Sequence, residues 1–155
     1  YISHIIYQQL LEDKKFTIKQ VSNYEDWGTI EDWNEYLNTY KTIFTDLDGV
    51  LVKNSGEYFG HKWGTTEALK NNVDHINKLY DTGRVRVIIT TSRKSSYKKQ
   101  TLDQLDKLGI KYHSIIFDLL HCKRVLINDF APTNNFPTST GINIPRNNNN
   151  LEEYF

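Results

Sequence analysis

The hydrophobic positions follow a regular order from residue 42 onward. Short apolar runs predict buried strands at residues 42–46, 85–90, 112–117, 124–128 and 142–144. Apolar residues at helical spacing predict helices over 65–80 and 96–108, each followed by a glycine that would end it. Strands that alternate with helices through short connections are typical of an α/β protein with a doubly wound parallel sheet.

The first 41 residues lack this order and are rich in tyrosine and tryptophan. Their patterns predict a helix over 2–15, a strand over 16–21 and a short helix capped by Thr29 with Glu31 two residues on. Because no self-contained core is visible, we expect an N-terminal α/β appendage, the tail of an upstream domain, over 1–41. A core domain is expected over 42–146. Residues 147–155 begin with four asparagines and are expected to form a loop or a frayed end.

Composition narrows the possible partners and the compartment. The 155 residues carry no formal net charge, which argues against binding to nucleic acid or to an anionic membrane. The single cysteine cannot form an internal disulfide, and neither a signal peptide nor a membrane-spanning run is visible, so we expect a cytoplasmic protein. The chain contains no methionine, even at position 1, so we expect it to be part of a longer protein.

Polar residues follow the predicted strands at the edge where parallel sheets hold their active sites. Asp46 and Asp48 close the first strand, Thr91 follows the second, Lys123 precedes the fourth and Asp129 follows it. Two carboxylates two residues apart can divide nucleophilic attack and proton transfer between them. Asp46, Asp129 and the backbone carbonyl of Asp48 are hard oxygen donors of the kind that bind Mg²⁺. An isolated Asp-x-Asp-Gly is more often a solvated turn, but the matching strand ends favour a site.

Three segments resemble motifs of the haloacid dehalogenase-like (HAD) phosphohydrolases, and the resemblance covers about residues 41–146. FTDLDGVLV resembles their first motif, IITTSR the second, and KRVLIND the third and fourth. The resemblance implies a Rossmann-like core in which Asp46 is the nucleophile that becomes an aspartyl phosphate and Asp48 is the general acid and then the base. It also implies that Thr91 binds a phosphoryl oxygen, that Lys123 neutralises charge and that Asp129 completes a Mg²⁺ site.

The match leaves some assignments open. Thr90 is a rival for Thr91, and Lys98 and Lys99 are rivals for Lys123. Asn128 stands where the family often has a second acidic residue, which would weaken the metal site. Members of the family often carry a cap domain, but the segments that could hold one are short here, so we expect no cap domain.

An open site must obtain its specificity from a short flap, from a neighbouring subunit of a homo-oligomer or from an upstream domain. Tyr58, His61 and Trp63 are the flap candidates, although ordinary packing of a loop explains His61 and Trp63 equally well. Arg93 begins a basic stretch and is a candidate for binding substrate, against the reading of that stretch as a solvated helix face.

The leading hypothesis is a Mg²⁺-dependent phosphomonoesterase that acts on a small phosphorylated metabolite. NYEDWGTIEDWNEY resembles the closing stretch of sugar-phosphate nucleotidyltransferases, which points to a sugar phosphate in nucleotide-sugar or surface-polysaccharide biosynthesis and to an upstream transferase domain in the same parent chain. The alternatives are a nucleic-acid end phosphatase, which zero net charge disfavours, and a non-catalytic oligomerisation module. Converging carboxylates that repel one another argue against the module.

Overall fold

The computed structural model describes residues 1–22, 24–55, 62–131 and 138–155, which fall into two compact units, 1–35 and 36–155. The first unit contains helix α1 (Ile2–Leu11) and most of α2 (Ile30–Asn38), as the patterns predict. The strand expected over 16–21 is wrong, since these residues form no strand and their side chains are exposed. An alternating pattern makes a strand only where another strand offers an edge, and the described residues of this unit contain none.

Thr29 caps α2 as predicted, although its partner is one residue further along than expected. The Thr29 hydroxyl oxygen accepts from the Asp32 amide at 3.1 Å, and the Asp32 carboxylate accepts from the Thr29 amide at 2.9 Å. These reciprocal bonds satisfy two amides that the helix start would leave unpaired.

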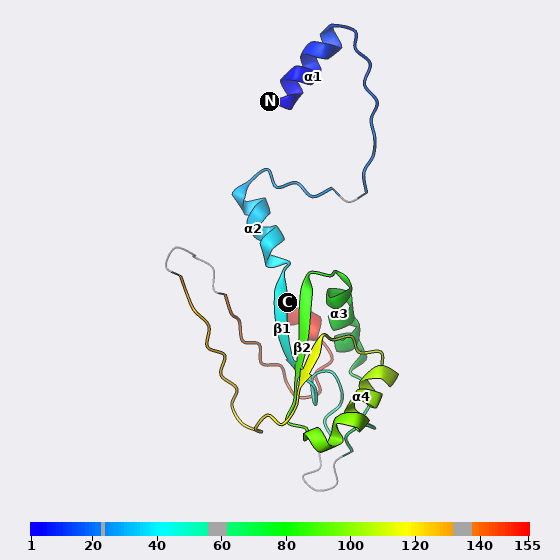
Figure 1. Ribbon diagram of the computed structural model, residues 1–155, viewed down its shortest axis with the longest axis vertical. Coiled ribbons are helices and arrows are strands. Elements are labelled where there is room, and N and C mark those ends of the chain that lie inside the picture. Colours follow the sequence, from blue (N-terminus) through cyan, green and yellow to red (C-terminus); the bar gives the residue numbers. More distant parts are fainter. Residues whose placement is uncertain (23, 56–61, 132–137) are drawn as a thin grey trace. The chain divides into compact units, whose positions relative to one another are not determined.

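The second unit is built on a parallel sheet of three strands in the order β1-β2-β3, shown in Figure 1. The strands are β1 (Lys41–Asp46), β2 (Val85–Thr90) and β3 (Ser114–Ile116). In the register of the first pair, Asp46 lies opposite Thr90, so both strands end at the same edge. The chain is therefore an α/β protein with a parallel sheet, as predicted, and the sheet positions the candidate residues at its carboxyl edge.

Helix α3 (Lys70–Asp81) connects β1 to β2, and η1 (Ser95–Tyr97) with α4 (Lys98–Lys107) connects β2 to β3. Helix α3 begins five residues later than predicted because the preceding residues pair with the loop after β1. The Lys53 amide donates to the Glu67 carbonyl at 2.8 Å, and the Leu69 amide donates to the Leu51 carbonyl at 2.9 Å.

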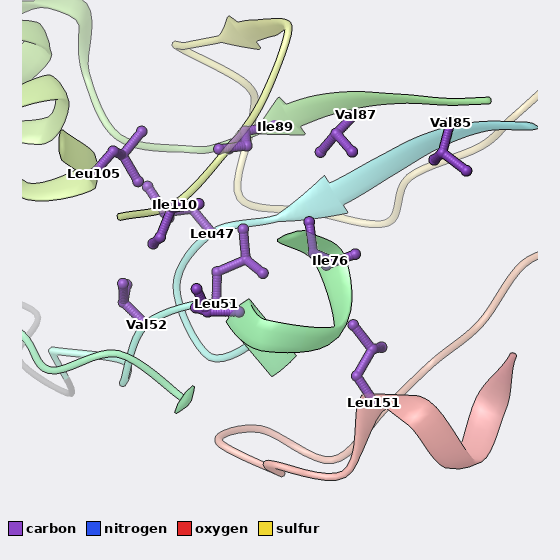
Figure 2. Packing of buried hydrophobic residues seen from close by; sticks show 11 residues of the cluster. Leu47, Leu51, Val52, Ile76, Val85, Val87, Ile89, Leu105, Ile110 and Leu151 are labelled. Carbon is purple, nitrogen blue, oxygen red and sulfur yellow. The ribbon is translucent and has the colours of Figure 1, made fainter. Parts of the chain in front are cut away.

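One hydrophobic cluster joins the sheet, the loop after β1 and both helices (Figure 2). Val87 and Ile89 of β2, Ile76 of α3 and Leu105 of α4 are fully buried. Leu47 and Leu51 are also fully buried, so the loop that carries the candidate carboxylates is part of the core.

The predicted strands at 124–128 and 142–144 are wrong. Neither range is a strand, and within the described residues the free edge of β1 pairs with no strand. Val125, Leu126 and Ile127 are 73%, 62% and 90% exposed. Their apolar run has the composition of a buried strand, but these residues do not pair with the free edge of β1 and form no regular secondary structure.

The end of the chain is expected to be a loop or a frayed end; residues 147–150 are a loop, but the chain then packs on the core and does not fray. Residues Leu151–Tyr154 form a 3₁₀ helix, η2, and Leu151 is 6% exposed within the hydrophobic cluster.

No helix among the described residues is long and apolar enough to cross a membrane.

Candidate active site

Asp46 is the last residue of β1 and presents its carboxylate at the carboxyl edge of the sheet. Its Oδ1 accepts from the amide of Leu47 at 2.8 Å and from Nη2 of Arg124 at 3.2 Å. The side chain is 36% exposed. Among the described residues Oδ2 accepts no hydrogen bond, so one oxygen is anchored while the other is open.

Asp48 lies in a tight loop whose backbone folds back on itself. The amides of Leu51 and Val52 both donate to the Leu47 carbonyl at 3.0 Å, and the Gly49 amide donates to the Val52 carbonyl at 2.7 Å. Gly49 has a φ of 89°, a conformation that glycine adopts without strain. The sequence Asp-Gly therefore makes the turn that holds the second carboxylate close to the end of β1.

Arg93 forms a two-point ion pair with Asp48. Its Nε donates to Oδ2 at 2.8 Å and its Nη2 to Oδ1 at 2.7 Å. The Arg93 side chain is completely buried, whereas 17% of the Asp48 side chain is exposed. Parallel bonds from a planar guanidinium fix both the position and the plane of a carboxylate. Arg93, expected to bind substrate, is placed here to orient Asp48.

The buried guanidinium is held in turn by α4. Nη1 of Arg93 donates to Gln104 Oε1 at 2.8 Å and to the Thr101 hydroxyl at 3.2 Å. Gln104 Oε1 also accepts from the Gly64 amide at 3.2 Å, while its Nε2 donates to the Thr66 carbonyl at 2.7 Å. The network thus joins Asp48, α4 and residues 64–66 at the end of the predicted flap.

Thr91 directly follows β2 and is 1% exposed. Its hydroxyl oxygen accepts from the Arg93 amide at 3.1 Å, and its own amide donates to the Ile116 carbonyl at 2.9 Å. The rival Thr90 donates its hydroxyl to the Thr45 carbonyl at 3.2 Å, inside the sheet. Thr91 is therefore the threonine of the loop and Thr90 the threonine of the strand.

The loops after β2 and β3 are tied together beside this edge. The Asp118 amide donates to the Arg93 carbonyl at 3.0 Å, and Asp118 Oδ1 accepts from the Ser95 amide at 3.0 Å. Hydrogen bonds from Ser95, helped by the nearby charge of Lys94, hold the pKa of the Asp118 carboxyl below its usual value. These bonds stabilise the loop that contains Arg93.

The structure does not bring together every predicted site residue. Among the described residues, Lys123 forms no ion pair with Asp46. The neighbouring Arg124 forms that ion pair instead. Asp129 belongs to the exposed segment 120–131. Trp63 packs edge-on against Tyr97 with ring centroids 5.0 Å apart. His61 and Tyr58 lie outside the described residues.

The donor set expected for a magnesium site is not assembled among the described residues. Asp46 offers an open carboxylate oxygen, and hard oxygen donors suit Mg²⁺. Within 1–22, 24–55, 62–131 and 138–155, however, no three acidic, histidine or cysteine residues come close enough to hold a metal ion. Asp129, the expected third ligand, is not gathered with Asp46 and Asp48.

A depression of about 460 Å³ lies at the opposite, amino end of the strands. Its lining residues include none of the predicted catalytic or metal-binding residues and are Tyr40, Lys41, Thr42, Gly83, Arg84, Val85, Arg86 and His113. The candidate site is therefore an open edge of the sheet rather than this hollow.

Sequence reasoning missed Arg124, Thr101 and Gln104. Arg124 adjoins the lysine that the family motif favours, and only the path of the chain distinguishes the two. Thr101 and Gln104 carried a usable signal, because they are polar residues on the same helix face as the buried Leu105. A polar residue on a core-facing helix position requires a hydrogen-bond partner inside the protein.

Comparisons with known proteins give weak similarities. No protein-family model and no curated protein matches the chain. A crystal structure of a target protein from Vibrio cholerae aligns with 57% of this chain and 79% of its own, at 15% identity and a TM-score of 0.42. A chain of a Pnkp1/Rnl/Hen1 complex aligns over 55% of this chain and 30% of its own, at 21% identity and a TM-score of 0.45. Similarities this low identify no family.

Proposed function

We propose that this chain is a Mg²⁺-dependent phosphomonoesterase of the HAD type that acts on a small phosphorylated metabolite. One observation carries the proposal, namely an open carboxylate beside a fixed one at the same sheet edge. Asp46 keeps Oδ2 open among the described residues, while Arg93 holds both oxygens of Asp48. A nucleophile needs an accessible lone pair, and a proton donor needs a fixed direction.

In the first half-reaction, Oδ2 of Asp46 forms a bond to phosphorus as the bond from phosphorus to the ester oxygen breaks. Asp48 gives its proton to that oxygen, so the alcohol leaves neutral. Each carboxyl oxygen has two lone pairs and Arg93 uses one on each, so Asp48 can carry the proton while it keeps both hydrogen bonds from Arg93. The product is an aspartyl phosphate on Asp46.

In the second half-reaction, Asp48 takes a proton from water as the water oxygen bonds to phosphorus. The bond from phosphorus to Asp46 breaks, inorganic phosphate leaves, and Asp48 is protonated again. Thr91, in the loop between β2 and Arg93, is assigned to a phosphoryl oxygen, and Arg124 or Lys123 to the charge of the nucleophile and phosphate. Arg93 acts through Asp48 and is a positioning residue.

Mg²⁺, when bound, would neutralise phosphate charge next to the attacking oxygen. Asp46, the Asp48 carbonyl and Asp129 would hold it. Asp129 follows Arg124 in the exposed segment 120–131. The contact of Arg124 with Asp46 brings the middle of this segment to the site. A sugar phosphate remains the expected substrate class.

The test is a screen of the purified chain with Mg²⁺ against sugar phosphates, nucleotides and 3′- or 5′-phosphorylated oligonucleotides. Phosphate release from a sugar phosphate is the expected result. Preference for the oligonucleotides would replace the proposal with the end-phosphatase alternative, and no release from any substrate would contradict phosphomonoesterase activity.

Two variants separate the carboxylates. Asp46→Asn should abolish turnover, because both half-reactions pass through its oxygen. Asp48→Asn should retain weak activity, with a loss of about 10²–10⁴-fold on an alkyl phosphate and a smaller loss on an aryl phosphate, whose leaving group needs little protonation. Asp103→Asn, on the exposed face of α4, is the matched control and should behave as the unmodified chain. Equal losses on both esters would contradict the role of Asp48.

A further inference from the structure

Asn147, the first of the four consecutive asparagines near the C-terminus, binds the loop that carries Asp48. The Asn147 amide donates to the Gly49 carbonyl at 2.8 Å, and the Asn147 Oδ1 accepts from the Asn54 amide at 2.8 Å. Asn147 therefore bridges two points of the loop, one directly after Asp48 and one six residues after it. Its φ of 62° lies in the left-handed region that asparagine tolerates better than most residues.

Asn72 of α3 joins the same loop to the C-terminal segment from inside the protein. Its side chain is completely buried. Its Nδ2 donates to the carbonyls of Val50 and Asn148, each at 2.7 Å, and its Oδ1 accepts from the Leu151 amide at 2.9 Å. The two donors and the acceptor of one buried amide are thus shared between the loop and the C-terminal segment.

The segment is anchored at its far end, so it can hold the loop firmly. Oδ1 of Asn149 accepts from the Asn71 amide at 3.0 Å, at the start of α3, where the helix's own N-cap residue supplies no side-chain bond. Figure 2 shows Leu151 pointing from η2 toward the hydrophobic cluster, in which it is 6% exposed. A cap and a buried leucine fix the segment on both sides of Asn150.

We propose that Asn147 is a positioning residue for Asp48, and that residues 147–151 form a clasp that sets the geometry of the catalytic loop. Arg93 fixes the Asp48 side chain, whereas the clasp fixes the backbone on which that side chain stands. The catalytic part of this inference rests on the proposed function. Its structural part, the holding of the loop, is independent of any activity.

The test uses Asn147→Gly in the full chain. Glycine removes the side-chain acceptor but adopts the positive φ easily, so the backbone path is preserved. Asn150→Ala is the matched control, because among the described residues the Asn150 side chain makes no hydrogen bond. Asn147→Asp keeps the accepting oxygen and serves as the conservative variant.

Hydrogen exchange reads the structural part. We expect the Asn54 amide to exchange at least about 5-fold faster in Asn147→Gly, with β2 amides unchanged and with near-normal exchange in Asn147→Asp and Asn150→Ala. Unchanged exchange at Asn54 would overturn the clasp whatever the chain catalyses.

Measurement of kcat on an alkyl and an aryl phosphate tests the catalytic part of the proposal. Displacement of a proton donor costs up to about 10²-fold in rate, and the cost falls on the ester whose leaving group needs the proton. Asn147→Gly should therefore lower kcat on an alkyl phosphate more than on an aryl phosphate. Equal losses on both esters, or no loss, would overturn the positioning role. If the unmodified chain hydrolyses neither ester, the proposed function fails, while exchange at Asn54 still decides whether the clasp exists.

Discussion

The two carboxylates at the end of β1 are held in different ways. Asp48 is paired with a fully buried Arg93 through two bonds of 2.7 and 2.8 Å. Asp46 meets an Arg124 whose side chain is 42% exposed, through one bond of 3.2 Å. The first arrangement is built into the core, and the second depends on an exposed segment. A proton donor gains from rigidity, whereas a nucleophile must stay accessible, so the difference matches the two proposed roles.

Removal of Arg93 should give the largest effect on stability. Arg93→Met leaves Asp48 without its partner, and losing one member of a buried pair costs about 3 kcal/mol or more. Arg93→Lys keeps the charge but not the two-point fork, so it should cost less. Urea denaturation measures both variants. If Arg93→Met lowers the free energy of unfolding by less than about 1 kcal/mol, the contribution of an exposed ion pair, then the pair does not fix Asp48.

The comparison also separates what the sequence predicts from what it does not. Asp46, Asp48, Thr91 and Arg93 meet near one edge because β1 and β2 form where the apolar runs predict them. Residues 124–128 have the same apolar character, yet they form a strand only if they pair with the edge of another strand. The pattern of one sequence does not show whether that pairing forms. Arg124 replaces Lys123 for the same reason, since the path of the segment decides which cation reaches Asp46.

The sequence analysis missed the C-terminal clasp for a different reason. Four asparagines carry no hydrophobic periodicity, so the pattern predicts a loop or a frayed end. Their order comes from single hydrogen bonds to Gly49, Asn54 and Asn72, which residue types alone do not reveal. The buried Leu151, directly after the run, was an apolar signal of this packing.

Leu151→Ala should show how much the clasp contributes to the rigid half of the site. The side chain is 6% exposed in the core, and removal of a buried leucine side chain costs about 2–3 kcal/mol. The variant should also speed exchange at Asn54. Phe155→Ala, at a half-exposed ring in the same terminal region, is the control and should cost less. An equal cost for both variants would contradict specific anchoring through Leu151.

Substitutions of Arg124 and Lys123 should differ in their effect on kcat, while both leave the stability nearly unchanged. Arg124→Gln should lower kcat by about 10-fold and change the free energy of unfolding by less than about 1 kcal/mol, because exposed pairs stabilise weakly. Lys123→Gln should have less effect on kcat. A larger loss for Lys123→Gln would show that the family motif, rather than the observed contact, identifies the catalytic cation.

Substitution of His75 should give the smallest effect, a change in how the stability depends on pH. Burial lowers its pKa, the charges of Lys78 and Lys41 lower it further, and Glu152 opposes them. A histidine whose pKa is lower when folded binds fewer protons in the folded state. Its contribution is therefore complete above the ordinary pKa of about 6.5 and decreases as pH falls below it. His75→Gln should flatten the decrease of Tm between about pH 7 and 5. An unchanged slope would assign the decrease to other groups.

Trapping of the covalent intermediate tests the central claim most directly. The unmodified chain, mixed with Mg²⁺ and an aryl phosphate and quenched in acid, should yield a peptide containing Asp46 that is heavier by one phosphoryl group. Asp46→Asn should yield none under the same conditions, while Asp48→Asn should still form the adduct from the aryl ester and lose it more slowly. Turnover of the aryl phosphate with the phosphoryl group on another residue, or an adduct that persists in Asp46→Asn, would contradict nucleophilic attack by Asp46.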